Sequence, residues 1–181
     1  MTDMFEACLA FTLGEEGGYV DNPADPGRAT NMGITLATYR EWSDNPDLGP
    51  TQVQDITART ARAIYRSLYW NPLRADALPR GVDLSVFDMG VNAGNWRSAR
   101  LLQRALGFTG DQVDGCIGPE TLGAAARLDA RALVNDLATR QADFYRSLAD
   151  YDIFGAGWLN RAEARRIAAL ALIDEAEPVS V

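Results

Sequence analysis

Helix start and stop signals recur along this chain, and they constrain its fold more than any other feature. Asp3, with Glu6 three residues later, resembles a capping box that opens a helix over residues 4–16, and Gly17-Gly18 ends that helix. The same kinds of signal predict further helices over 35–42, 57–70, 81–94, 96–107, from 119, over 129–149 and over 158–174.

One stretch between these helices reads differently. Residues 19–34 are dense in Pro, Gly, Asp and Asn, which is typical of turns and a short hairpin, and strand signals elsewhere are few. The sequence therefore predicts a mostly α fold with a small hairpin after the first helix. We expect a boundary near 76–85 that divides a first part, 1–85, from a helical part, 86–175, packed against it, followed by a frayed tail, 176–181.

The composition excludes several kinds of active site. Histidine is absent, which rules out Ser-His-Asp and Cys-His catalysis and every histidine-based metal site. The two cysteines, Cys8 and Cys116, are too few for a zinc cluster, and we expect both to be reduced. Acid–base chemistry near neutral pH must then use carboxylates, tyrosines or arginines, and no metal or cofactor is implied.

Charge and hydropathy argue against nucleic acid as a partner and against a membrane span or a secretory signal. The net charge of -8 argues against nucleic acid, which favours a basic surface. No apolar run approaches the ~18 residues of a membrane span, and the N-terminus lacks the basic start of a secretory signal. We expect a protein made in the cytoplasm, so that a substrate outside would require another route of delivery.

The first helix ends in two adjacent acids that are not equivalent. On a helical wheel Glu16 falls in the middle of the apolar stripe that contains Phe5 and Leu9, whereas Glu15 falls at its margin. Burial and the negative end of the helix dipole both disfavour a charge on Glu16, and so favour the proton-donating form that a general acid requires. The alternative is a structural Glu16 that caps the helix or pairs with an arginine.

The residues after Glu16 favour the chemical interpretation. Gly17 and Gly18 leave room for a ligand, and the turn-rich segment then supplies Asp25 and Thr30 in the spacing Glu-x8-Asp-x4-Thr. A glycosidase needs an acid on one side of the scissile bond and a carboxylate on the other, to stabilise an oxocarbenium ion or to activate water. A Glu at a helix end that faces a loop Asp and a hydroxyl could provide both without histidine.

The segment "EEGGYVDNPADPGRATNMGIT" resembles the signature of glycoside hydrolase family 108, the phage-type and bacterial N-acetylmuramidases. Further matches are "IYRSLYWNP", "FDMGVNAG", "LLQRALG", "VDGCIGPETL" and "GWLNR", so the likeness spans about residues 5–170. The family's catalytic glutamate corresponds to Glu16. One departure is Arg28, which stands where the family has a glycine. The roles of Asp25 and Thr30 are implied by a looser similarity to the Glu/Asp/Thr arrangement of phage-type lysozymes.

The resemblance implies a lysozyme-like fold and the hydrolysis of the β-1,4 bond between N-acetylmuramic acid and N-acetylglucosamine. It also implies that the second half is a peptidoglycan-binding region and that the protein binds peptidoglycan. We expect the protein to be a monomer. Delivery through a holin pore or by a phage-like particle would bring the enzyme to the cell wall. The alternatives are a lytic transglycosylase, a chitinase or chitosanase, and a non-catalytic wall-binding or virion protein.

Several other residues have two interpretations each. Tyr19, Tyr69 and Trp70 are either core aromatics or surfaces that stack on sugar rings, and Asp88 and Asn92 share one helix face as cleft or supporting residues. Arg97, Arg100 and Arg104 also lie on one side of their helix, opposite Ala99, Leu102 and Leu106. They form either a solvated face or a binding face for the carboxylates of peptidoglycan stem peptides.

Overall fold

The computed structural model describes residues 3–21 and 29–176, and these form two compact units. The first unit extends to Leu68 and contains α1 (Met4–Glu15), β1 (Val20–Asp21), β2 (Ala29–Asn31), β3 (Ile34–Thr35), α2 (Leu36–Ser43), α3 (Pro50–Gln54) and α4 (Ala58–Tyr65). The second begins at Tyr69 and contains the short helix η2 (Ala75–Ala77), α5 (Val82–Ala93), α6 (Asn95–Ala105), η3 (Gly110–Gln112), α7 (Pro119–Ala125), α8 (Ala130–Arg146) and α9 (Tyr151–Asp174). The predicted mostly α class with a small sheet is confirmed.

Local capping signals place the helices of the first unit. The Thr35 and Thr57 hydroxyls accept hydrogen bonds from the third residue of α2 and of α4, which confirms both as N-caps. Asp3 caps α1 by accepting from Phe5 N, but the predicted capping box is wrong, because the Glu6 carboxylate pairs with Arg62 of α4 instead. The predicted helix over 57–70 ends as an α-helix at Tyr65 and continues as a π-helical turn, η1 (Arg66–Trp70).

A small antiparallel sheet follows α1, in the order β1-β2-β3. Thr30 pairs with both Val20 and Thr35, so β2 is the central strand. Met32 and Gly33 join β2 to β3 with positive φ angles of 49° and 72°, the pattern of a type I′ hairpin turn. The buried Asn31 amide donates to the carbonyls of Val53 and Gln54, which holds β2 against α3.

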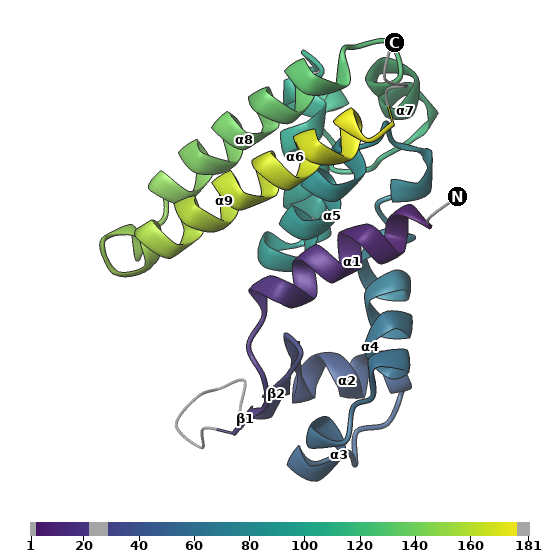
Figure 1. Cartoon of the computed structure of the whole chain (residues 1–181), viewed down its shortest axis with the longest axis vertical. Helices are drawn as coiled ribbons and strands as arrows, with labels where there is room; N and C mark the ends of the chain where they lie inside the picture. The colour runs from purple at the N-terminus through teal and green to yellow at the C-terminus, as the bar shows by residue number, and fades with distance from the viewer. Residues whose placement is uncertain (1–2, 22–28, 177–181) are drawn as a thin grey trace. The chain divides into compact units, whose positions relative to one another are not determined.

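The second unit is built around α5, whose residues from Val82 to Gly90 are all buried. Helices α6, α8 and α9 all pack on α5, and α8 and α9 form a long antiparallel pair (Figure 1). Gly94 with φ of 91° ends α5 and is itself the N-cap of α6, so Asn95 is the first residue of that helix and not its predicted cap. Helix α9 begins at Tyr151, earlier than the predicted residue 158, because Gly155 fits against the Tyr151 ring without interrupting the helix.

The predicted division at residue 85 differs from the division of the compact units at Leu68 and stays a prediction. The predicted frayed tail lies outside the described residues, except for Ala176. Within residues 3–21 and 29–176, none of the helices combines the length and the apolar character needed to cross a membrane.

A buried acid in the first turn of α5 gives the stability a dependence on pH. Asp83 Oδ1 accepts hydrogen bonds from Gly81 N and Leu84 N, both at 2.7 Å, and burial raises the pKa of this carboxyl group to about 6. The pKa is higher in the folded chain than in the unfolded chain, so the folded chain binds more protons between the two values. The free energy of unfolding should therefore decrease as the pH rises from about 4 to about 6, by about 3 kcal/mol from this group.

An Asp83→Asn variant keeps the acceptor oxygen but has no charge to bury. Urea unfolding of the variant and of the wild type at pH 4 and pH 7 measures this contribution. We expect the variant to gain about 3 kcal/mol relative to the wild type between those two pH values. Parallel stability profiles for the two proteins would contradict the assignment.

Candidate active site

Glu16 lies at the junction between α1 and the sheet. It is the C-cap of α1, with extended backbone angles of φ -91° and ψ 146°, and its N–H donates to Leu13 O. Its side chain is half-buried, whereas that of Glu15 is exposed, so the predicted distinction between the two acids is present in the structure. The direction of Glu16 comes from its extended backbone and not from the helical wheel, because the helix has already ended.

The Glu16 side chain packs on the β2–β3 turn at Gly33. A Cβ atom added to Gly33 would lie 2.8 Å from both Cγ and the carboxyl carbon of Glu16, and 2.6 Å from the Tyr65 hydroxyl oxygen. The carboxyl group and the phenol therefore meet over a backbone position that has no side chain. The buried Tyr65 hydroxyl also donates to Met32 O at 2.8 Å, which fixes the turn on which Glu16 rests.

The sheet places one predicted partner of Glu16 in the same unit. Thr30 is half-buried in the central strand β2, two residues before the Met32-Gly33 turn on which the Glu16 side chain packs. Tyr19, a residue that is 37% exposed, immediately precedes β1. Asp25 lies outside the described residues. Gly17 and Gly18 have open space where a Cβ would be, so the backbone beside Glu16 is uncovered.

The other predicted site residues belong to the second unit. Tyr69 is half-buried, and Trp70 is fully buried with its ring edge-on to Phe87 at a centroid distance of 5.4 Å. Asn92 is exposed, and its amide oxygen accepts a hydrogen bond from Tyr145 of α8 at 2.8 Å. In this structure Trp70 has no surface on which a sugar could lie, and its assignment to substrate binding stays a prediction.

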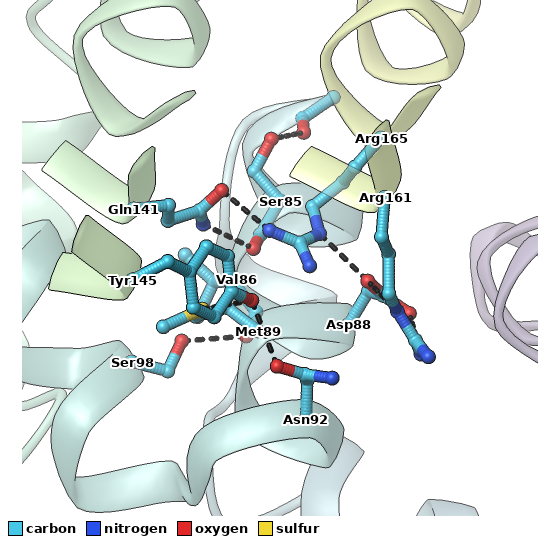
Figure 2. A network of polar contacts seen from close by, with 11 residues as sticks. Ser85, Val86, Asp88, Met89, Asn92, Ser98, Gln141, Tyr145, Arg161 and Arg165 are labelled. Carbon is cyan, nitrogen blue, oxygen red and sulfur yellow. Dashed lines mark hydrogen bonds and ion pairs between the residues drawn. The ribbon is translucent and has the colours of Figure 1, made fainter. Parts of the chain in front are cut away.

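Asp88 is fully buried and is held by two arginines of α9. Arg161 Nη2 donates to Asp88 Oδ1 at 2.8 Å, and Arg165 Nε donates to Asp88 Oδ2 at 2.6 Å (Figure 2). Burial alone would raise the pKa of Asp88, but the guanidinium groups of Arg165 and Arg161 outweigh burial and hold that pKa below its usual value. These contacts account for a carboxylate inside an apolar helix; a further role toward sugar stays a prediction.

Sequence reasoning did not single out Gly33, Tyr65, Arg161 or Arg165. The "NMG" turn signal could have marked Gly33, because a hairpin turn with positive φ favours glycine. Nothing local marks Tyr65 or the two arginines, because their partners lie 33 to 77 residues away in the sequence.

The arrangement is suited to proton transfer by a carboxyl group. Glu16 is partly exposed, rests on the Gly33 turn and lies beside two glycines that leave space for a ligand. Among the described residues, no group of three or more metal-ligating side chains is close enough to hold a metal ion. The junction itself offers the Glu16 carboxyl group and the Tyr65 hydroxyl beside it.

Two family models and a solved structure match this chain. The family model described as glycosyl hydrolase 108 matches residues 9–94, and the model described as a predicted peptidoglycan domain matches residues 97–163. The chain is similar to the solved structure of SagA from Brucella abortus, with 36% sequence identity over 98% of each chain and a TM-score of 0.84. No curated protein matches the sequence. The chain therefore belongs to glycoside hydrolase family 108, with a C-terminal peptidoglycan-binding region, and is a peptidoglycan hydrolase.

Proposed function

We propose that this enzyme is an N-acetylmuramidase that cleaves the β-1,4 bond between N-acetylmuramic acid and N-acetylglucosamine. The observation that carries the proposal is the position of Glu16, whose carboxyl group rests on the Gly33 turn beside the Tyr65 hydroxyl and next to uncovered backbone. A sugar chain that crosses Gly17 and Gly18 would bring a glycosidic oxygen within reach of that carboxyl group. The family membership supports the same residue.

In the proposed mechanism Glu16 is the general acid that protonates the leaving glycosidic oxygen. Tyr65 positions Glu16 through the turn, because its hydroxyl is bonded to Met32 O and occupies the space beside the carboxyl group. Asp25 and Thr30 are proposed to stabilise the developing positive charge or to orient water on the other face of the sugar. Thr30 lies on the central strand, which connects to the turn under Glu16.

We further propose a role in cell-wall lysis in a phage or phage-like system, where the enzyme acts as a monomer. A membrane pore or a particle would deliver it to the wall. The resemblance of the Glu16 segment to phage-type muramidases supports this role.

The identity of the new reducing end tests the bond specificity. Purified peptidoglycan is digested, reduced with borohydride and hydrolysed, and the sugar alcohols are measured. We expect muramic acid to be the reduced sugar, with no release of reducing ends from chitin or chitosan. Glucosaminitol as the main product would show cleavage of the other glycosidic bond, and rapid degradation of chitin would show a different substrate.

A Gly33→Ala variant tests whether the turn positions Glu16. The added methyl group would lie 2.6 Å from the Tyr65 oxygen and 2.8 Å from the Glu16 carboxyl carbon, on a backbone with φ of 72°. We expect hydrolysis of purified peptidoglycan to decrease about 10- to 100-fold, because a reacting group displaced by about 1 Å loses that much. The left-handed backbone adds a stability cost of about 1–2 kcal/mol, measured by urea unfolding.

Gly14→Ala is the matched control for that variant. Gly14 lies on the exposed side of α1 with nothing within 4 Å of an added Cβ, so the control should keep wild-type activity and gain a little helix stability. A folded Gly33→Ala protein that hydrolyses the wall at the wild-type rate would show that the turn does not position Glu16.

A further inference from the structure

A groove with an excess of positive charge lies between α6 and α8 in the peptidoglycan-binding region. One face of α6 contributes Trp96, Arg97, Arg100, Leu101 and Arg104, and α8 contributes Arg140, Asp143, Phe144 and Ser147. This part encloses a cavity of about 380 Å³. A second cavity, of about 570 Å³, shares Arg100, Arg104 and Arg140 and continues to the loop at Gly107–Gly110. We call the two cavities together the α6–α8 groove.

Three of the four arginines in the groove have no acidic partner among residues 3–21 and 29–176. Arg140 pairs with Asp136, and the Asp143 carboxylate pairs with Arg146. Arg97, Arg100 and Arg104 make no ion pair with any residue in the described part of the chain. Like charges three and four residues apart on a helix destabilise it, and a bound anion would relieve that repulsion. The groove is thus a local cationic site in a protein with a net charge of -8.

Aromatic rings hold two of these arginines in place. The guanidinium carbon of Arg97 lies 4.4 Å from the centre of the Phe144 ring, and that of Arg100 lies 4.2 Å from the centre of the Trp96 ring. A guanidinium that lies over a ring keeps its in-plane N–H groups free for a planar carboxylate, which it can bind with two parallel hydrogen bonds. The two cations are therefore oriented before any ligand arrives.

Trp96 is held in position by its direct neighbours. A Cβ on Gly115 would lie 2.3 Å from Cδ1 of Trp96, so the 55% exposed indole rests against bare backbone. The buried Gln103 side chain holds that backbone by accepting from Gly115 N and donating to Asp114 Oδ1 and Cys116 O. Gly115, Trp96 and Arg100 thus form a stack supported from inside the unit.

We propose that the α6–α8 groove binds the free carboxylates of the peptide stems of peptidoglycan. The N-acetylated glycan backbone is uncharged, so the stems carry the negative charge of the polymer, and their short aliphatic side chains match the apolar wall of Leu101, Trp96 and Phe144. The net charge of -8 repels anionic polymers and membranes at long range, so binding must come from short-range contacts between single carboxylates and the guanidinium groups inside the groove. The proposal rests on peptidoglycan as the substrate and not on the role proposed for Glu16.

Binding to sacculi without teichoic acid tests the proposal, because the anions of such sacculi are carboxylates. A Glu16→Gln protein prevents digestion, and Arg97→Gln/Arg100→Gln is compared with Arg59→Gln/Arg127→Gln in that background. The control pair removes the same charge from arginines outside the groove. We expect the groove variant to bind intact sacculi at least ~10-fold more weakly than the Glu16→Gln parent, because it loses hydrogen bonds to charged groups. The control variant should bind like the parent.

Sacculi whose carboxylates have been converted to amides provide the second arm, on which all three proteins should bind equally weakly. If the groove variant lost as much affinity for amidated sacculi as for intact ones, the groove would bind sugar. If the control variant lost as much affinity for intact sacculi as the groove variant, the effect would be one of long-range charge. Binding of the parent to phosphatidylglycerol vesicles that the groove variant loses, with sacculus binding unchanged, would assign the groove to membranes. Each of these results overturns the proposal.

If the double variant unfolds, Arg104→Gln repeats the test, because Arg104 is exposed and makes no ring contact within the described residues. This variant should weaken binding to intact sacculi but not to amidated sacculi. If the Glu16→Gln background still digests sacculi, the proposed catalytic role fails. Binding of the same proteins to digestion-resistant, chemically cross-linked sacculi would still decide the role of the groove.

Discussion

A Glu16→Gln variant is expected to hydrolyse peptidoglycan about 10²- to 10⁴-fold more slowly than the wild type, the usual contribution of a general acid. The amide keeps the size of the side chain and its packing on Gly33, but it cannot donate an acidic proton to the leaving oxygen. Binding to sacculi should remain, because the α6–α8 groove is unchanged. The rate is measured as reducing ends released from purified peptidoglycan, and binding by co-sedimentation.

Glu15→Gln is the matched control for Glu16→Gln. The two acids are neighbours with the same chemistry, but the Glu15 side chain is exposed and Glu16 is half-buried on the turn. We expect Glu15→Gln to keep the wild-type rate. Similar losses from the two substitutions would show that charge near the end of α1, and not a positioned acid, governs the rate.

An Asp88→Ala variant is expected to be destabilised by about 3–5 kcal/mol, because it leaves buried guanidinium charge without its carboxylate. Arg165 is 1% exposed and Asp88 is fully buried, so water cannot replace the lost contacts. The same network continues from Arg165 to Gln141 of α8, which donates to Ser85 O (Figure 2). Urea unfolding measures the loss directly.

The matched control for Asp88→Ala is Asp136→Ala, which removes an exposed carboxylate paired with Arg140 on the surface of α8. A surface pair of this kind contributes about 0.3–0.5 kcal/mol. Asp88 has a lowered pKa in the folded protein, so its contribution should be present above about pH 4 and decrease as the pH falls through the folded pKa. A loss below 1 kcal/mol for Asp88→Ala would show that the network does not hold α5 to α9.

Local signals in the sequence were sufficient for several helix starts, but not for α3 (Pro50–Gln54), which was not predicted, or for the start of α9. Thr35, Thr57 and Asp129 each accept a hydrogen bond from the helix they precede, and that bond depends only on residues nearby in the chain. The capping box at Asp3 failed for the opposite reason, because Arg62 competes for Glu6 from 56 residues away. Helix ends are predictable where no distant charge competes for the cap.

The candidate site was predictable only in part, for a similar reason. The helical wheel predicted that Glu16 and Glu15 differ in burial, and they do, but the burial of Glu16 comes from its extended backbone after the end of α1. The turn under Glu16 requires Tyr65 to reach Met32, and the burial of Asp88 requires α9 to fold back on α5; both depend on tertiary packing. Which residue acts with Glu16 stays a prediction, and Asp25 and Thr30 remain the candidates.

Digestion of purified peptidoglycan in ¹⁸O-labelled water, by the wild type and by Glu16→Gln in parallel, tests the central claim most directly. Mass spectrometry should find reducing muramic acid ends that carry one ¹⁸O atom from the wild type, and background amounts from Glu16→Gln. Hydrolysis incorporates one oxygen from water at the cleaved bond, whereas a lytic transglycosylase incorporates none and leaves 1,6-anhydro ends. Anhydro ends, or labelled ends released by Glu16→Gln at the wild-type rate, would contradict the account.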